Sequence, residues 1–376
     1  FWWSPRQSQT QEIAHGITKT SVDGSFELNF EAKPDKSVDK KNDPSFNFSI
    51  KVDVIDQTGE TRTGSTSVRL GYKAMEASLS SGNWLTTDKA VGFNIGTTTL
   101  DGQPVSASGK LDIYQLKQPD KPAAKLLYQG YRRYGRSSAR NSDPSNWKSW
   151  KDGTKVKSLN FATKSGGSAS VKAKLKAGVY RARLTTKDRY GNEVVAFLPF
   201  MVLSPTASKF AVKVPNQLTF KSTNVEVGST LEAVWGTGYK SGRAFIEIEH
   251  RGTLVKRFWT QTGKTQYFLQ IPVKEKYRGG FTVHFTYVRE NRQYTSSQNV
   301  SVPWTNKELD ITFETFRSAL KPNQKEKWVL KLKGKSAKLR AAEMVATMYD
   351  TSLDTFARLH WPSFSSNFRR EYSNTN

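Results

Sequence analysis

The chain has 376 residues, which is enough for three or four domains of roughly 100 residues each. Its 58 Lys and Arg residues outnumber its 33 Asp and Glu residues, giving a formal net charge of +25, and it contains no cysteine. The absence of cysteine excludes disulfides, thiol nucleophiles, thiolate metal ligands and a thioester within these residues. Because the basic residues are scattered through every segment, we expect no nucleic-acid partner.

Apolar and polar residues alternate with a period of two in many segments, which is the pattern of half-buried β-strands. In three places such a strand runs into a polar turn and a returning strand. These three predicted hairpins occupy residues 46–72, 179–203 and 281–302. Their recurrence predicts tandem β-sandwich domains, each ending in a hairpin of this kind.

The predicted fold class is therefore all-β, with tandem immunoglobulin/fibronectin-like β-sandwich domains. The predicted domains are 1–72, 73–204, 205–303 and 304–376. The first and last offer fewer strands than the roughly seven of a sandwich, so we expect them to be the C-terminal and N-terminal parts of incomplete domains. We accordingly expect the chain to be an internal part of a longer polypeptide, whose remaining domains would be partners of these residues.

One stretch near the C-terminal end differs from the strand pattern. Residues 339–348 are rich in Ala, Leu, Met and Glu, and their structure stays open between helix and strand. Asp350 is a suitable cap for a short helix over residues 351–356.

No group of side chains in the sequence has the spacing of a catalytic or metal-binding motif. The histidines are far apart, and we expect His284 to face solvent on the polar side of a strand, where His250 could approach it from a neighbouring strand. Glu247 and Glu249 alternate with isoleucines, which predicts that both carboxylates point to solvent. We therefore predict no enzyme activity, no bound metal and no cofactor.

A basic segment at residues 131–147 has the composition of an exposed loop. Its arginines are Arg132, Arg133, Arg136 and Arg140. Because Gly, Ser, Asn and Pro surround these arginines, we expect the segment to be flexible and sensitive to proteases. Three interpretations stay open: a solvated connection between strands, a cleavable trigger, and an anion-binding arm.

Several segments of the sequence resemble those of a known family. Three of them are GITKTSVDGSFELNFEA (16–32), IDQTGETRTGSTSVRLGY (55–72) and LKAGVYRARLTTKDRYGNEV (175–194). They resemble hairpin ends of the consecutive macroglobulin-type β-sandwiches that make up the chains of the bacterial alpha-2-macroglobulin family. Two are similar to the bait-region domain: VEVGSTLEAVWGTGYKSGRAFIEIEHRGTLVKRFW (225–259) and QIPVKEKYRGGFTVHFTYVRENRQY (270–294). Two are similar to the next macroglobulin domain: ELDITFETFRSALKPNQKEKWVLKLKG (308–334) and AAEMVATMYDTSLDTF (341–356). The resemblance implies that all four predicted domains are macroglobulin-type.

In that family a protease cuts an exposed bait segment, the sandwiches rearrange and the protease is trapped; some members also tether it through a Cys-x-Glu-Gln thioester. The resemblance therefore implies a scaffold of a broad-spectrum protease inhibitor, with proteases as partners. It also implies an extracytoplasmic location, in the bacterial periplasm or at the outer membrane and cell surface. The sequence has no thioester motif, and no long low-complexity insert interrupts residues 218–303.

A second class of function stays open, namely a cell-envelope binding, adhesion or assembly scaffold without protease trapping. In that case exposed aromatic side chains would contact a glycan, lipopolysaccharide or another cell-envelope protein. The candidates are Trp2, Trp3, Trp147 and Trp150.

Overall fold

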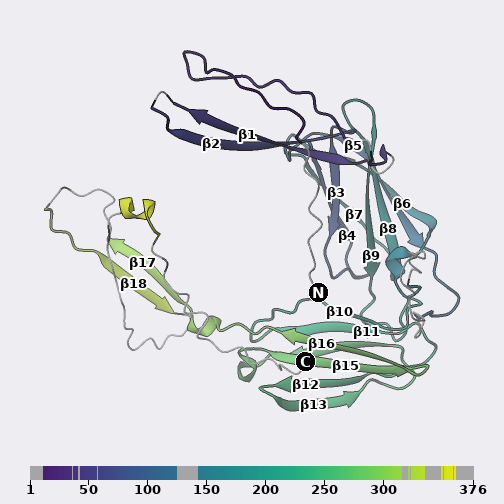
Figure 1. Cartoon of the computed structure of the whole chain (residues 1–376). Coiled ribbons are helices and arrows are strands. Elements are labelled where there is room, and N and C mark those ends of the chain that lie inside the picture. Colours follow the sequence, from purple (N-terminus) through teal and green to yellow (C-terminus); the bar gives the residue numbers. More distant parts are fainter. Residues whose placement is uncertain are drawn as a thin grey trace, which may run out of the picture. The chain divides into compact units, whose positions relative to one another are not determined.

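The computed structural model describes residues 12–35, 37–40, 43–56, 58–124, 143–315, 321, 323–334, 349, 351–358 and 360. Strands β1 to β18 and a few short 3₁₀ helices make up the regular structure of these residues, which confirms the predicted all-β fold class (Figure 1). No helix in them is long and apolar enough to cross a membrane. The chain divides into two compact units, residues 1–117 with 147–203 and residues 118–146 with 204–376, and each unit is described by itself.

The first unit contains a two-sheet sandwich, in which all neighbouring strands are antiparallel. One sheet has the order β3-β4-β7, formed by Glu76–Ser81, Val91–Thr98 and Ser168–Ala173. The other has the order β6-β5-β8-β9, formed by Asp152–Ala162, Ser108–Leu116, Gly178–Lys187 and Glu193–Val202. The alternation of the sequence places one side of each sheet in the core. Its fully buried side chains include Phe93, Leu111, Ile113 and Leu184.

The second unit contains a sandwich of the same topology. Its three-stranded sheet has the order β10-β11-β14, formed by Gln217–Phe220, Thr230–Gly236 and Gln266–Pro272. Its four-stranded sheet has the order β13-β12-β15-β16, formed by Thr253–Trp259, Phe245–His250, Phe281–Arg289 and Arg292–Val300. Each strand of the second sandwich has the same position in its sheet as the strand of the first sandwich whose number is lower by seven, for example β10 and β3. The two sandwiches are therefore structural repeats of one another.

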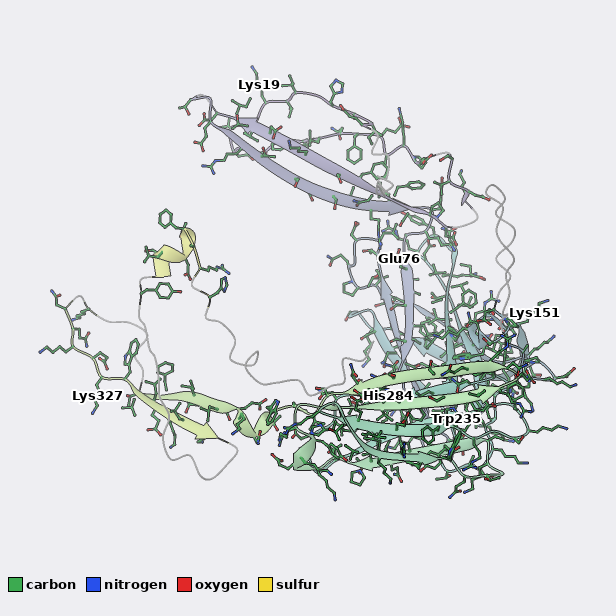
Figure 2. All side chains as sticks on the ribbon, turned by 60° about the horizontal axis from the view of Figure 1, so that its bottom comes forward. Lys19, Glu76, Lys151, Trp235, His284 and Lys327 are labelled. Carbon is green, nitrogen blue, oxygen red and sulfur yellow. The ribbon has the colours of Figure 1, made fainter. Side chains whose placement is uncertain are left out.

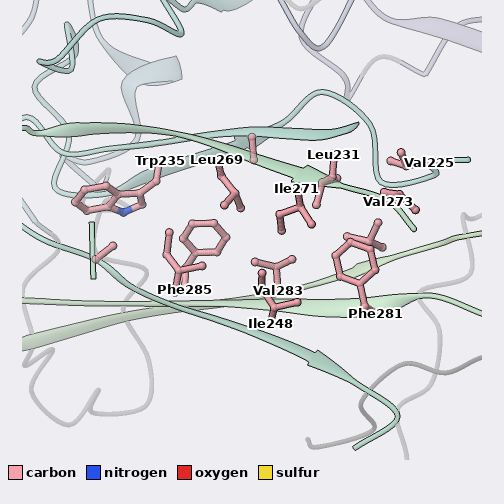
Figure 3. Close-up of a cluster of buried hydrophobic side chains, with 14 of the residues drawn as sticks. Val225, Leu231, Trp235, Ile248, Leu269, Ile271, Val273, Phe281, Val283 and Phe285 are labelled. Carbon is pink, nitrogen blue, oxygen red and sulfur yellow. The ribbon is translucent and has the colours of Figure 1, made fainter. Parts of the chain in front are cut away.

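The core of the second sandwich is centred on aromatic and branched side chains that meet between the two sheets. Trp235, Leu269 and Ile271 point from the three-stranded sheet toward Ile248 and Phe285 of the other sheet (Figure 3). Trp235 is 1% exposed, and its Nε1–H donates to the side-chain oxygen of Asn216 at 2.8 Å. A buried indole is thus both packed and hydrogen-bonded, as an apolar ring with one polar group requires.

Two further hairpins lie outside the sandwiches: β1–β2 (Ser45–Ile55 and Thr61–Gly71) and β17–β18 (Leu309–Thr315 and Val329–Gly334). The three hairpins predicted from the sequence are confirmed as β1–β2, β8–β9 and β15–β16. The predicted short helix over residues 351–356 is a 3₁₀ helix, η5, at Thr351–Thr355. Residues 339–348 and Asp350 lie outside the described residues, and the predicted domain boundaries remain predictions.

The turns of β1–β2 and β8–β9 are built in the same way. In each, an aspartate Oδ1 accepts the backbone N–H groups of the residues two and four positions later, and the residue three positions later is a glycine. Gly59 and Gly191 have φ of 85° and 84°, a conformation that favours glycine. The aspartates are Asp56 and Asp188, so a D-x-x-G turn repeats with the hairpin.

Asp188 has an additional role, because it also holds the chain segment that precedes β3. Its Oδ2 accepts the backbone N–H of Ala74 at 2.9 Å, and the residue is 7% exposed. Burial by itself raises the pKa of this carboxyl, but hydrogen bonds from Ala74, Asn192 and Tyr190 outweigh burial and lower the pKa to about 2.

Substitution of Asp188 by Asn should therefore increase amide exchange at Ala74 about tenfold or more, since losing hydrogen bonds to a charged group costs about 1.5–3 kcal/mol. Because the folded-state pKa lies below the ordinary value, the carboxylate stabilises the fold above about pH 4 and loses this effect as the pH falls toward 2. Hydrogen exchange of the Ala74 amide measures the effect. The matched control is Asp56→Asn, which changes the equivalent turn of β1–β2. An equal effect of both variants at Ala74 would contradict the specific contact of Asp188.

Candidate functional site

The four-stranded sheet of the second sandwich brings together three polar side chains that are distant in sequence. His284 lies on β15, in the sandwich that also contains Trp235 (Figure 2). It contacts Glu249 on β12 (Nε2 to Oε2, 3.0 Å) and Ser297 on β16 (Nδ1 to Oγ, 2.8 Å). The side chains of His284 and Glu249 are 21% and 16% exposed, so both lie on the predicted polar face but reach solvent only in part, because they contact each other. His250 does not join them: its Nδ1 lies 2.8 Å from the carbonyl oxygen of Gly280.

Serine, histidine and carboxylate in contact are the components of a hydrolase triad, but a triad also needs a substrate cleft and donors for an oxyanion. Ser297 is an exposed residue in a regular edge strand. A large cleft among the described residues is lined by residues of the first unit, and Ser297 does not line it. We therefore interpret the three side chains as a cross-strand contact that fixes the register of β12, β15 and β16. No group of three or more metal-ligating side chains occurs in the described ranges either.

The basic segment predicted to be protease-sensitive is described only at its end. Arg132, Arg133, Arg136 and Arg140 lie outside the described residues, and their role remains a prediction. After them, Trp147–Ser149 forms the short helix η2, and Trp147 and Trp150 are half-buried. Arg181 on β8 donates to the carbonyl oxygens of Lys148 and Trp150 at 2.8 and 3.0 Å, which fastens this end to the first sandwich.

The β17–β18 hairpin contrasts with the sandwiches, because every residue of β17 is exposed. Its apolar residues Leu309, Ile311 and Phe313 are 47%, 57% and 54% exposed. A two-stranded sheet alone is marginally stable in water, and segments with few buried contacts open at low free-energy cost. The hairpin thus has the properties of a segment that can open locally while the sandwiches stay folded.

The connection between β17 and β18 contains exposed lysines. The carbonyl oxygen of Lys321 accepts the N–H of Gln324 at 3.1 Å, in a turn where Asn323 has a φ of 61°. Lys325 and Lys327 follow as exposed residues outside any strand. A protease needs an accessible backbone that can become extended, and a lysine before the cut bond suits a trypsin-like enzyme. We define residues 324–327 as the lysine segment.

Where the chain leaves the second sandwich, the buried side chain of Arg278 is the centre of a cluster of hydrogen bonds, which we call the Arg278 cluster. Its Nη1 donates to Glu226 Oε1 at 2.7 Å, to the carbonyl oxygen of Pro303 and to Thr305 Oγ1 at 3.2 Å, and its Nε donates to Glu275 at 2.9 Å. Arg278 is 7% exposed. Pro303 and Thr305 belong to the segment that leads through η4 (Thr305–Lys307) to β17, so one side chain holds the end of the sandwich to this segment.

Comparison with protein families gives one relevant match. Residues 198–354 match the model described as the alpha-2-macroglobulin bait region domain. This range contains the second sandwich, the Arg278 cluster and the lysine segment, whereas residues 131–147 lie outside it. A comparison with curated proteins gave no match.

Three solved structures are similar over most of this chain. The crystal structure of Salmonella alpha-2-macroglobulin reacted with methylamine is 12% identical, with a TM-score of 0.26 over 77% of this chain and 19% of that chain. The native conformation of E. coli alpha-2-macroglobulin is 12% identical, with a TM-score of 0.28 over 78% and 19%. A tetra-tandem repeat from the extending region of a large adhesion protein is 15% identical, with a TM-score of 0.23 over 72% and 60%. The chain thus spans about a fifth of the length of either alpha-2-macroglobulin.

Proposed function

We propose that this chain, which belongs to the alpha-2-macroglobulin family through its bait-region domain at residues 198–354, is part of the scaffold of a protease inhibitor. The observation that carries the proposal is that the exposed lysine segment lies inside the residues matched to that domain. Proteases are then the partners. The family also supports an extracytoplasmic location, in the bacterial periplasm or at the cell surface.

A cut in the lysine segment would separate β17 from β18, which the sequence joins only through this connection. The two strands are held by their ladder and by Thr315, whose Oγ1 accepts the N–H of Val329 at 3.0 Å. In the intact chain the loop keeps β17 and β18 close together, so little entropy is lost when they pair. After the cut the two strands are no longer joined by this loop, and pairing them again costs more entropy. The exposed apolar row of β17 is then available to pack elsewhere, and such a change of packing is the physical basis of trapping.

Limited digestion with trypsin tests where the chain is cut first. We expect the earliest cut after Lys325 or Lys327, and we expect the double variant K325Q/K327Q to slow this cut at least tenfold, because trypsin requires a basic residue before the bond. The measurement is mass spectrometry of the first fragments. The matched control is K256Q/R257Q, which removes two adjacent basic residues from strand β13 and should leave the rate of the first cut unchanged.

Inhibition is tested on the full-length protein with the same protease. Trapping predicts that the protease keeps its activity on small peptides and loses it on protein substrates after the first cut, and that K325Q/K327Q prevents the loss. A first cut within residues 131–147 would instead support the trigger interpretation of that loop. Undiminished activity on protein substrates, with slow and scattered cuts, would overturn the inhibitor proposal in favour of a cell-envelope binding scaffold.

A further inference from the structure

The peptide bonds on the two sides of Trp328 are both held by one hydroxyl group of β17. Thr315 Oγ1 donates to the carbonyl oxygen of Lys327 at 3.4 Å and accepts the N–H of Val329 at 3.0 Å. Thr315 is the last residue of β17 and pairs with Val329, the first residue of β18. A single side chain therefore fixes the Lys327–Trp328 and Trp328–Val329 bonds to the end of the hairpin.

The side chain of Trp328 makes a second contact with β17. Its ring lies edge-to-face with that of Phe313, with centroids 6.2 Å apart and an angle of 89° between the planes. Trp328 is half-buried, whereas the four residues of the lysine segment before it are exposed. Edge-to-face aromatic pairs are favourable beyond the area that they bury. We call Thr315, Phe313 and the Trp328 that they hold the Trp328 clamp.

The chain is also held at the start of the lysine segment, but more weakly. The N–H of Gln324 donates to the carbonyl oxygen of Lys321, and the N–H of Lys321 donates to Gln324 Oε1, both at 3.1 Å. Both residues are exposed, so water can replace these bonds when the turn opens. Opening the Trp328 clamp also separates two aromatic rings and breaks the first pair of the strand ladder. The Lys325–Glu326 bond lies between these two points of attachment.

The position of a bond relative to the Trp328 clamp decides how easily a protease can cut it. A protease binds its substrate as an extended strand and holds the carbonyl oxygen of the cut bond with its own donors. The carbonyl oxygen of Lys327 already accepts from Thr315, so the clamp must release it before the Lys327–Trp328 bond is cut. Cutting after Trp328 requires the packed indole itself to enter the protease. The carbonyl group of Lys325 lies outside the clamp.

We propose that the Trp328 clamp directs proteases to the Lys325–Glu326 bond and protects the two bonds beside Trp328. This inference rests on the proposed inhibitor function and specifies its partner, which is a lysine-specific protease and not one that prefers aromatic residues. Charge favours the same partner, because residues 321–327 contain three lysines and one glutamate. A protease that binds lysine in an acidic pocket is attracted to such a segment.

Digestion of the whole chain with a lysine-specific endopeptidase tests the order of cutting. Mass spectrometry of the fragments gives the initial rates of the cuts after Lys325 and after Lys327, and hence their ratio. The same ratio is measured in a synthetic peptide of residues 320–332, which has the same sequence around both bonds but lacks β17. We expect the ratio to be at least tenfold higher in the whole chain, because only the chain has the Trp328 clamp. Equal ratios in chain and peptide would contradict the proposal.

Substitution of Thr315 tests the hydroxyl group of the clamp. Thr315→Val keeps the shape of the side chain but removes both hydrogen bonds, so the ratio should fall at least threefold toward that of the peptide. The rate at which chymotrypsin cuts after Trp328 should rise by a similar factor. Thr315→Ser keeps the hydroxyl and should preserve the ratio. The matched control is Thr312→Val, because Thr312 Oγ1 contacts the carbonyl oxygen of Lys331 at 3.4 Å in the same hairpin, outside the clamp.

The outcomes separate the Trp328 clamp from the inhibitor function. A ratio that is unchanged in Thr315→Val would overturn the proposal, and so would an equal fall in Thr312→Val, since general loosening of the hairpin would then set the order. If Lys325 is cut first but the protease keeps its activity on protein substrates, the clamp is supported and only trapping is overturned. If the protease is trapped after a first cut at another bond, the inhibitor function is supported and the clamp proposal is wrong.

Discussion

Replacing Trp235 by alanine is expected to destabilise the second sandwich by about 3–5 kcal/mol, the usual cost of truncating a fully buried aromatic side chain. The indole is 1% exposed and lies edge-to-face with Tyr287, with ring centroids 5.3 Å apart. Truncation leaves a cavity between the two sheets and leaves Asn216 without the donor that the indole supplies. Amide exchange in β11 and β15 should therefore accelerate by two orders of magnitude or more.

The matched control is Trp259→Ala, because Trp259 lies in the same sandwich but is 55% exposed on the edge strand β13. It contacts Phe245 at a centroid distance of 4.9 Å, and we expect its removal to cost no more than about 1 kcal/mol. Hydrogen exchange followed by mass spectrometry measures both variants region by region. Equal effects of the two substitutions would mean that the core of this sandwich is not centred on Trp235.

The repeated hairpins could be predicted because each depends on local information. In β15, residues Phe281, Val283 and Phe285 alternate with polar residues, and the alternation alone identifies the strand and its buried side. The returning strand follows after the two-residue turn Glu290–Asn291, whose φ angles of 51° and 55° suit a hairpin turn. Strand, turn and return are adjacent in sequence, so no knowledge of the rest of the fold was needed.

The cluster around His284 could not be predicted, because it depends on which strands become neighbours in the sheet. Glu249 lies on β12, and two strands separate β12 from β15 in the chain although the two strands pair in the sheet. The register places Glu247 opposite His284 and Glu249 opposite Thr282, two residues along the strand, and it is Glu249 whose carboxylate reaches the imidazole. The alternation correctly placed these residues on the polar face, but it could not show that they contact each other.

Arg278 was also missed, and for a different reason. In the sequence it stands between Tyr277 and two glycines, in a segment with the composition of a solvated turn. Its partner Glu226 lies in the loop between β10 and β11, whereas Pro303 and Thr305 follow β16, and only the closed fold brings them together. A buried arginine of this kind is recognised from its partners and not from a local pattern.

Replacing Arg278 by methionine is expected to destabilise the second sandwich by about 2–4 kcal/mol, because hydrogen bonds to charged groups are lost and Glu226 remains without its partner. Burial raises the pKa of the Glu226 carboxyl, but the hydrogen bonds from Arg278, Thr305 and the Val227 backbone, together with the charge of Arg278, outweigh burial and lower the pKa. The carboxylate therefore contributes stability above its unfolded-state pKa and loses it as the pH falls. The effect of Arg278→Met should accordingly be largest near neutral pH and smaller in acid.

The junction is the place where the chain leaves the second sandwich. Its opening is measured by amide exchange at Gly279, whose N–H donates to the carbonyl oxygen of Val302 at 3.0 Å. We expect Arg278→Met to accelerate it strongly and Arg278→Lys to have an intermediate effect, since lysine keeps the charge but cannot reproduce the planar set of donors. Arg257→Met, at an exposed position of β13, is the control and should change stability by less than about 0.5 kcal/mol.

Arg278→Met also tests whether the junction at Arg278 and the proposed cleavage site open independently of each other. The opening of β17–β18 depends on its own ladder and on Thr315, and none of the bonds of Arg278 reaches the lysine segment. The rate of the first tryptic cut should therefore stay unchanged in Arg278→Met while exchange at the junction increases. Cutting that accelerates in parallel with exchange would mean that the hairpin opens only when the junction loosens, and that Arg278 controls access to the lysine segment.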